Sequence, residues 1–167
     1  MFWALRGGGG GTYGVVTSTT YKTYPTLSLT SAVLTIKFDS PDIAQDVTTE
    51  YIKFHPIFSD AGWCSYLDLS NSSFSANLIA PSTAWADASL TFLSFVQYAK
   101  EATGGQVQLD ITPFASFYEF FLATAAEKER TTGALVEMAS RLLPRSLAEN
   151  DPAKVAKILL SLDVHMV

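Results

Sequence analysis

The sequence contains one cysteine and two histidines among 167 residues, and this scarcity excludes several kinds of site. Cys64 alone cannot form an internal disulfide, and it cannot build a cysteine-based zinc site. His55 and His165 stand apart, and neither belongs to an H-x-x-x-H or H-E-x-x-H pattern. We therefore predict that the protein holds no metal ion.

Basic residues are also few, with 11 Lys and Arg against 16 Asp and Glu, which gives a net charge of -5. Because the basic residues are scattered along the chain, they form no stripe that could follow a phosphate backbone, and we expect no nucleic-acid partner. The longest apolar runs are interrupted by charged residues or proline, so we expect no membrane partner. The N-terminus shows no signal peptide, and the sequence leaves the location of the protein open.

Apolar residues are plentiful, at 48% of the chain with 13% aromatic, which is enough to build a sizeable core. Several segments alternate between apolar and polar residues and are predicted strands, and others show helical spacing after a capping residue and a proline. The predicted strands are Ser31–Phe38, Trp63–Leu69, Ser73–Ala80, the segment around Val107–Ile111, and Ala134–Leu142. The predicted helices begin at Ser40-Pro41, at Ser82, at Thr112-Pro113 and at Asp151-Pro152. This arrangement predicts an α+β fold, with an antiparallel β-sheet covered by helices on one face.

A run of glycines near the N-terminus is the most unusual stretch of the sequence. The residues of interest are Arg6, Gly7, Gly8, Gly9, Gly10, Gly11, Thr12, Tyr13, Gly14, Val15 and Val16. Glycines let successive N–H groups converge on an anion, and an arginine beside them suits a phosphate. A flexible linker is the competing interpretation. The run also satisfies G-x-G-x-x-G, but strand formers follow it where a dinucleotide-binding Rossmann fold requires a helix.

The segment Phe2–Ser18, with this glycine run at its centre, resembles a signature of FAD-linked oxidases related to berberine bridge enzyme. These enzymes belong to the vanillyl-alcohol oxidase superfamily and carry a PCMH-type FAD-binding domain. A weaker similarity covers Ser140–Ser146. The resemblance implies that residues 1–25 are the tail of the FAD-binding domain, which contacts FAD through Arg6–Val16. It also implies that residues 26–167 are a substrate-binding α+β domain that is incomplete at its C-terminus.

The resemblance implies a function as well. Enzymes of this family oxidise an alcohol, an amine or a similar secondary-metabolite or sugar substrate and pass a hydride to flavin N5. The relatives carry a long FAD-binding region before the glycine motif, so we expect a partial chain whose partner is the missing FAD-domain half. The alternative is a non-catalytic remnant or binding module that keeps only the substrate-domain fold. Full-length relatives are often secreted.

Oxidation of an alcohol or amine needs a group that removes a proton, and tyrosine and carboxylates are the usual choices. Tyr66 and Asp68 share one face of a predicted strand, and Asn77 lies on the neighbouring strand. Glu137 and Arg141 share one face of the predicted strand Ala134–Leu142. We predict Glu137, Tyr66 and Arg141 as catalytic residues. The competing interpretation is that they are solvated sheet residues or a structural ion pair.

Overall fold

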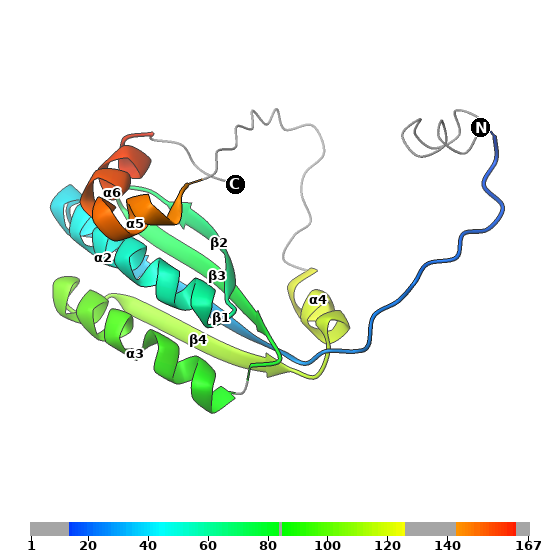
Figure 1. Cartoon of the computed structure of the whole chain (residues 1–167). Helices are drawn as coiled ribbons and strands as arrows, with labels where there is room; N and C mark the ends of the chain where they lie inside the picture. Colours follow the sequence, from blue (N-terminus) through cyan, green and yellow to red (C-terminus); the bar gives the residue numbers. More distant parts are fainter. Residues whose placement is uncertain (1–13, 84, 126–142, 163–167) are drawn as a thin grey trace.

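A four-stranded antiparallel sheet forms the centre of the computed structural model, which describes residues 14–83, 85–125 and 143–162 (Figure 1). The strands are β1 (Leu29–Lys37), β2 (Cys64–Leu69), β3 (Ser73–Pro81) and β4 (Val107–Phe114). Their spatial order is β2-β3-β1-β4, so β1 and β3 are central and β2 and β4 are the edges of the described sheet. The predicted α+β fold with an antiparallel sheet is confirmed, while the predicted strand Ala134–Leu142 lies outside the described residues.

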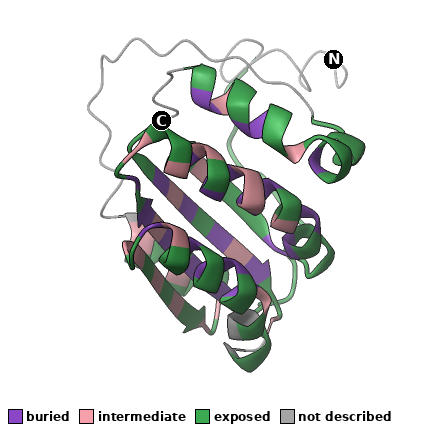
Figure 2. Cartoon of the chain, turned by 90° about the vertical axis from the view of Figure 1, so that its left-hand side faces the viewer, coloured by how far each residue is buried: buried purple, intermediate pink, exposed green. Residues whose placement is uncertain are grey.

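Helices cover one face of this sheet. They are α2 (Pro41–Asp60), α3 (Trp85–Ala102), α5 (Arg145–Asn150) and α6 (Pro152–Ser161), while α4 (Phe117–Ala125) lies at one end of the sheet (Figure 1). The buried sides of α2 and α3 face the strands, and α5 and α6 pack against α2 (Figure 2). Within the described part of the chain, no helix has the length and hydropathy to cross a membrane.

Local sequence signals determine both ends of α2. Ser40 is the N-cap, because its Oγ accepts a hydrogen bond of 3.3 Å from the Ile43 N–H, and Pro41 follows as the first helical residue. At the other end Gly62 adopts a left-handed backbone with φ +83°. The Gly62 N–H bonds to the Ser59 carbonyl and the Trp63 N–H to the Phe58 carbonyl, which is a Schellman ending.

Aromatic rings fill the space between the sheet and α2 and α3. Tyr51 packs its ring 4.7 Å from that of Phe74 and 5.4 Å from that of Phe95, measured between ring centroids. Phe92 lies 4.8 Å from both Phe58 and Trp63. All of these rings are buried, and β1 and β3 contribute their alternate apolar residues to the same core. The core therefore joins the helix layer to one face of the sheet.

Two predicted helix starts are wrong. The helix predicted at Thr112-Pro113 begins only at α4, because Thr112 and Pro113 continue β4 and pair with Ser31 and Thr30 of β1. An edge strand tolerates proline, which donates no ladder hydrogen bond. The N-cap predicted at Ser82 is also wrong. Ser82 lies three residues before α3, and its φ of 55° differs from the extended backbone of an N-cap. Its N–H donates a hydrogen bond to the Ser28 carbonyl at the start of β1.

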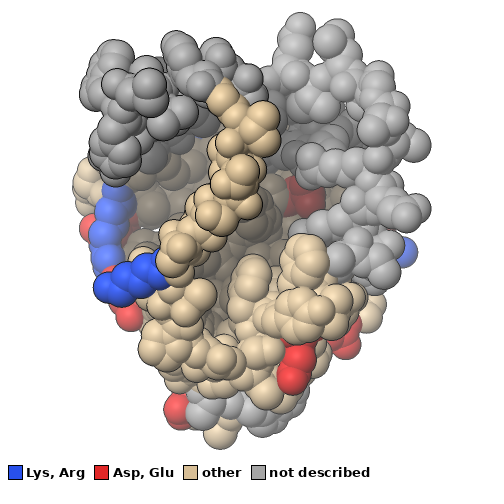
Figure 3. Space-filling view, turned by 90° about the vertical axis from the view of Figure 1, so that its right-hand side faces the viewer, with Lys and Arg blue, Asp and Glu red and all other residues tan. Residues whose placement is uncertain are grey.

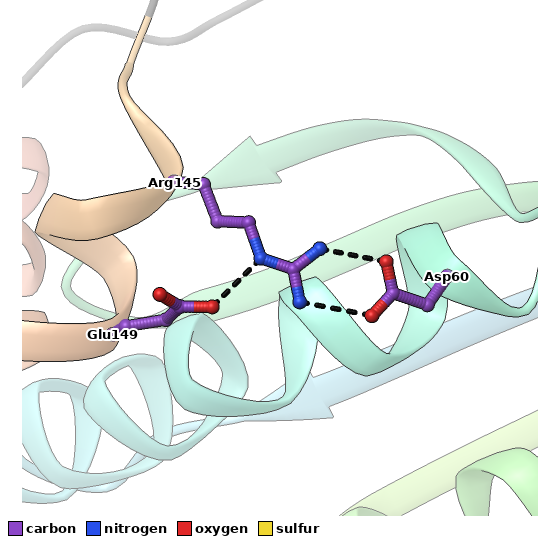
Figure 4. Close-up of polar contacts among 3 residues, drawn as sticks. All are labelled: Asp60, Arg145 and Glu149. Carbon is purple, nitrogen blue, oxygen red and sulfur yellow. Dashed lines mark hydrogen bonds and ion pairs between the residues drawn. The ribbon is translucent and has the colours of Figure 1, made fainter.

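A single arginine ties α5 to the end of α2 (Figure 4). The Arg145 guanidinium donates two parallel hydrogen bonds to the Asp60 carboxylate, at 2.6 and 2.9 Å, and a third to Glu149 at 2.7 Å. The hydrogen bonds from Arg145 lower the pKa of Asp60 from its ordinary value of 3.8. Because α2 has no basic residue in its own last turn, Arg145 also supplies the positive charge that a helix C-terminus favours.

Candidate functional site

The sheet face opposite to α2 and α3, which we name the open face, carries polar side chains. Side chains alternate between the two faces along each strand. Leu67, Ala76 and Leu34 point into the core, so the residues next to them in sequence lie on the open face. The strand register places Tyr66 opposite Asn77, Asn77 opposite Val33, and Val33 opposite Asp110. These four residues form one row that runs across all four strands.

The row is long enough to contact a drug-sized molecule. Neighbouring strands lie about 4.8 Å apart, so three strand spacings separate Tyr66 from Asp110 by about 14 Å. A second row, Asp68–Ser75–Thr35–Gln108, lies beside it according to the same register. The open face therefore offers hydroxyl, amide and carboxylate groups on a rigid surface made of hydrogen-bonded strands.

Tyr66 is the most prominent side chain of this face. It lies in the middle of the edge strand β2 and is 81% exposed. Cys64 and Asp68 flank it on the same face, and both are exposed. A phenol hydroxyl both donates and accepts hydrogen bonds, so Tyr66 can contact a ligand above the sheet without any movement of the backbone.

The far end of the row carries a carboxylate that was not among the predicted site residues. Asp110 is exposed on β4, and its Oδ2 accepts a hydrogen bond of 2.7 Å from the Gln108 amide. The alternation of Val107, Leu109 and Ile111 already implied that Gln108 and Asp110 face away from the core. What the sequence could not supply is the pairing of β4 with β1, which brings Asp110 into the row of Tyr66.

The other predicted catalytic residues, Glu137 and Arg141, lie outside the described residues. The structure therefore neither brings them to the row of Tyr66 nor separates them from it. Their catalytic roles stay predictions, as does that of Tyr66.

Three of the eleven predicted cofactor-binding residues are described, namely Gly14, Val15 and Val16, while Arg6–Tyr13 lie outside the described residues. The three are exposed and form part of an extended segment that leads into β1. Nothing lies within 4 Å of the position that a Cβ on Gly14 would occupy. Their role in binding a cofactor stays a prediction.

Comparison with known proteins agrees with the fold and the sequence signature. No family model matches the chain. The chain is 26% identical over 157 residues to the FAD-linked oxidoreductase patO of Penicillium expansum. This alignment covers 93% of this chain and 28% of that protein. It is 30% identical over 165 residues to the FAD-linked oxidoreductase ZEB1 of Gibberella zeae, covering 90% of this chain and 27% of that protein. The chain thus spans little more than a quarter of the length of these relatives.

A solved structure shows the same arrangement of elements. It is that of a VAO-type flavoprotein from Myceliophthora thermophila, with a TM-score of 0.68 at 21% identity. The match covers 97% of this chain and 30% of the flavoprotein. Over about nine-tenths of its length, this chain is therefore homologous to one segment of the FAD-linked oxidoreductases, and it has the fold found in VAO-type flavoproteins.

Proposed function

We propose that this chain is the substrate-facing part of an FAD-dependent oxidoreductase that acts on a small alcohol, amine or similar molecule. The observation that carries the proposal is the open face, on which Tyr66 and Asn77 lie directly opposite each other on neighbouring strands. Homology to FAD-linked oxidoreductases over nine-tenths of the chain supports FAD as the cofactor.

Different residues of the open face have different roles in binding the substrate. In this proposal Tyr66 Oη accepts the proton that leaves the substrate hydroxyl or amine and releases its own proton to solvent, and the Asn77 amide hydrogen-bonds the same polar group. Asp110, held by Gln108, fixes the opposite end of the substrate. Glu137 and Arg141 belong to this proposal as further catalytic groups. Bound FAD would accept the hydride from the substrate carbon.

FAD would be held on one side by the segment Arg6–Val16. By itself this segment offers a few backbone hydrogen bonds, each contributing about 1 kcal/mol net. Binding costs at least about 4 kcal/mol of translational and rotational freedom. The two terms nearly cancel, and a Kd of 1 mM would require a net free energy of about -4 kcal/mol, so we expect the chain alone to bind FAD much more weakly than about 1 mM. Saturable micromolar binding in a titration followed by flavin fluorescence would show instead that the chain forms a complete site.

A chimera tests the function. The chain replaces the matching segment of the Gibberella zeae FAD-linked oxidoreductase, and we expect the product to be yellow and its flavin to be reduced by at least one member of a panel of small alcohols and amines. In the chimera Tyr66→Phe should slow flavin reduction by about 10²-fold or more, as removal of a proton-transfer group does, at unchanged FAD content. Tyr98→Phe on α3, on the other side of the sheet, is the matched control and should leave the rate unchanged.

The outcomes separate an oxidoreductase from a non-catalytic binding module. A yellow chimera whose flavin stays oxidised with every alcohol and amine of the panel would support the binding module, and our proposal would be wrong. A chimera that reduces flavin normally after Tyr66→Phe would remove Tyr66 from the mechanism and leave the oxidoreductase function in place.

A further inference from the structure

The row of four residues across the open face contains one aliphatic side chain. Val33 lies on the central strand β1, between Asn77 of β3 and Asp110 of β4. Its neighbours on the same face of β1 are Ser31 and Thr35, so polar residues surround it on four sides. A polar substrate group above Val33 would lose its hydrogen bonds with water and gain none from this side chain. The part of a substrate that lies on Val33 is therefore apolar.

Beyond Val33 the row ends at a carboxylate. Asp110 Oδ2 accepts a hydrogen bond of 2.7 Å from the Gln108 amide, and both residues lie on β4. A carboxylate accepts hydrogen bonds and donates none, and it has more acceptor sites than this one bond uses. The substrate group that binds Asp110 must therefore be a hydrogen-bond donor.

No basic side chain in the described part of the chain neutralises this carboxylate. The described ion pairs join residues of α2 and α5, and none of them includes Asp110. Lys37 shares the open face, but it lies four residues along β1 from Val33, at a distance of about 14 Å. Figure 3 shows the molecule from the side of the open face, and most of the described atoms visible there belong to uncharged residues. The negative charge of Asp110 thus has no described partner of opposite sign.

A substrate that covers the row would remove Asp110 from water. Burying a carboxylate without a partner of opposite charge is costly. A neutral hydroxyl would leave the charge uncompensated, whereas a cationic donor compensates it through a stronger, charge-assisted hydrogen bond. The group that fits this end of the row best is therefore an ammonium.

We propose that the substrate carries an ammonium group at the end opposite to the group that is oxidised. Two strand spacings separate Asn77 from Asp110 by about 10 Å, and three separate Tyr66 from Asp110 by about 14 Å. The ammonium then lies about 10–14 Å from the oxidised group, with an apolar section on Val33 between them. This inference rests on the proposed function and adds the substrate class, which is an alcohol or amine with a second, cationic amine.

Calorimetry with the FAD-containing chimera tests the substrate class. The probes are amino alcohols of increasing length, with the hydroxyl and the ammonium at opposite ends of a saturated chain, and the matched alcohols without the amine. We expect the amino alcohols to bind more tightly than the matched alcohols by about tenfold or more, as a hydrogen bond to a charged group does. The preference should be largest at a spacing of about 10–14 Å between the two polar groups. Added salt should weaken it.

Three variants separate the contributions of the row. Asp110→Asn should abolish the preference for amino alcohols. Asp39→Asn is the matched control, because the Asp39 carboxylate also accepts a hydrogen bond from a glutamine amide, that of Gln106 at 2.6 Å, but lies beyond the end of β1. It should bind both series like the unaltered chimera. Val33→Thr should weaken both series alike, by about fivefold or more, because a hydroxyl would face their apolar section. Circular dichroism should show the same folded state for all three.

Three results would overturn the inference. One is equal affinity for amino alcohols and matched alcohols, or a preference that Asp110→Asn leaves unchanged. Another is binding of diols of the same spacing as tightly as amino alcohols, because a neutral donor would then suffice. The third is loss of the preference in Asp68→Asn and not in Asp110→Asn, which would place the cation at the other edge strand.

The same chimera distinguishes failure of the inference from failure of the proposed function. A chimera that oxidises a member of the alcohol and amine panel but shows no preference for amino alcohols would reject the ammonium group alone. A chimera that holds no FAD, or whose flavin stays oxidised with the whole panel, would count against the proposed function and the inference together.

Discussion

Truncation of Phe92 should remove a large part of the stability of this fold. Phe92 is fully buried on α3, and its ring lies 4.8 Å from both Phe58 and Trp63. Replacing a buried phenylalanine by alanine costs about 3–5 kcal/mol, through lost transfer free energy and the cavity that remains. The two aromatic contacts account for about 1–3 kcal/mol of this, at about 0.5–1.5 kcal/mol each. Because domains are stable by about 5–15 kcal/mol, we expect Phe92→Ala to lower the free energy of unfolding by about a third.

The next residue provides the matched control. Leu93 is 56% exposed, so Leu93→Ala should change the free energy of unfolding by no more than about 0.5 kcal/mol. The measurement is urea unfolding of the full chain followed by far-ultraviolet circular dichroism, with the midpoint shifting and the slope constant. If Phe92→Ala does not fold, Phe92→Leu still tests the aromatic contacts, with an expected cost of about 1–3 kcal/mol. A Phe92 variant as stable as Leu93→Ala would refute the assignment of this ring to the centre of the core.

Three further predictions concern the ends of α2. Ser40→Ala should lower the free energy of unfolding by about 1 kcal/mol in urea titrations, because the Ile43 N–H loses its acceptor, whereas Ser40→Asp should keep the stability within error. Gly62→Ala should cost about 1–2 kcal/mol in the same assay, since alanine is disfavoured at φ +83°; a neutral or stabilising result would contradict the Schellman ending. The pairing of Asp60 with Arg145 lowers the pKa of this carboxyl, so its contribution is complete above pH 3.8 and is lost as the pH falls through the lower folded-state pKa. Urea titrations should therefore find the unaltered chain more stable than Arg145→Met above pH 3.8 and should show this difference disappear as the pH falls below it, and a difference that persists unchanged at lower pH would contradict the pairing.

Local chemistry made much of the fold predictable from the sequence. Ser40-Pro41 fixes the start of α2, and alternation in β1 and β3 identifies the strands, because these signals act within a few residues. The hairpin between β2 and β3 is equally clear around Asn71, where the Ser70 hydroxyl accepts hydrogen bonds from the Ser72 and Ser73 N–H groups. The open face and the position of Tyr66 on it follow from the same alternation.

Features that depend on distant parts of the chain were not predictable in this way. Thr112-Pro113 looks like a helix start, but pairing with β1 keeps these residues in a strand. In α6 the helical period places Ile158 and Leu162 beside Val155, yet both are about half exposed, since α6 is covered by α2 on one side only. The row that joins Tyr66 to Asp110 likewise requires the strand order, which no local pattern contains.

The central position of β1 has a consequence for how the chain folds. Its partners on both sides, β3 and β4, follow later in the sequence, separated from it by α2, by β2 and by α3. The β2–β3 hairpin is local and forms within microseconds. Pairing of β1 with β3 and with β4 is slower, because each pairing closes a long loop of intervening chain. Until then both edges of an apolar strand are unpaired, which makes aggregation compete with folding. Pulsed hydrogen exchange during refolding should therefore protect β2 and β3 before β4, and early protection of β4 would contradict this order.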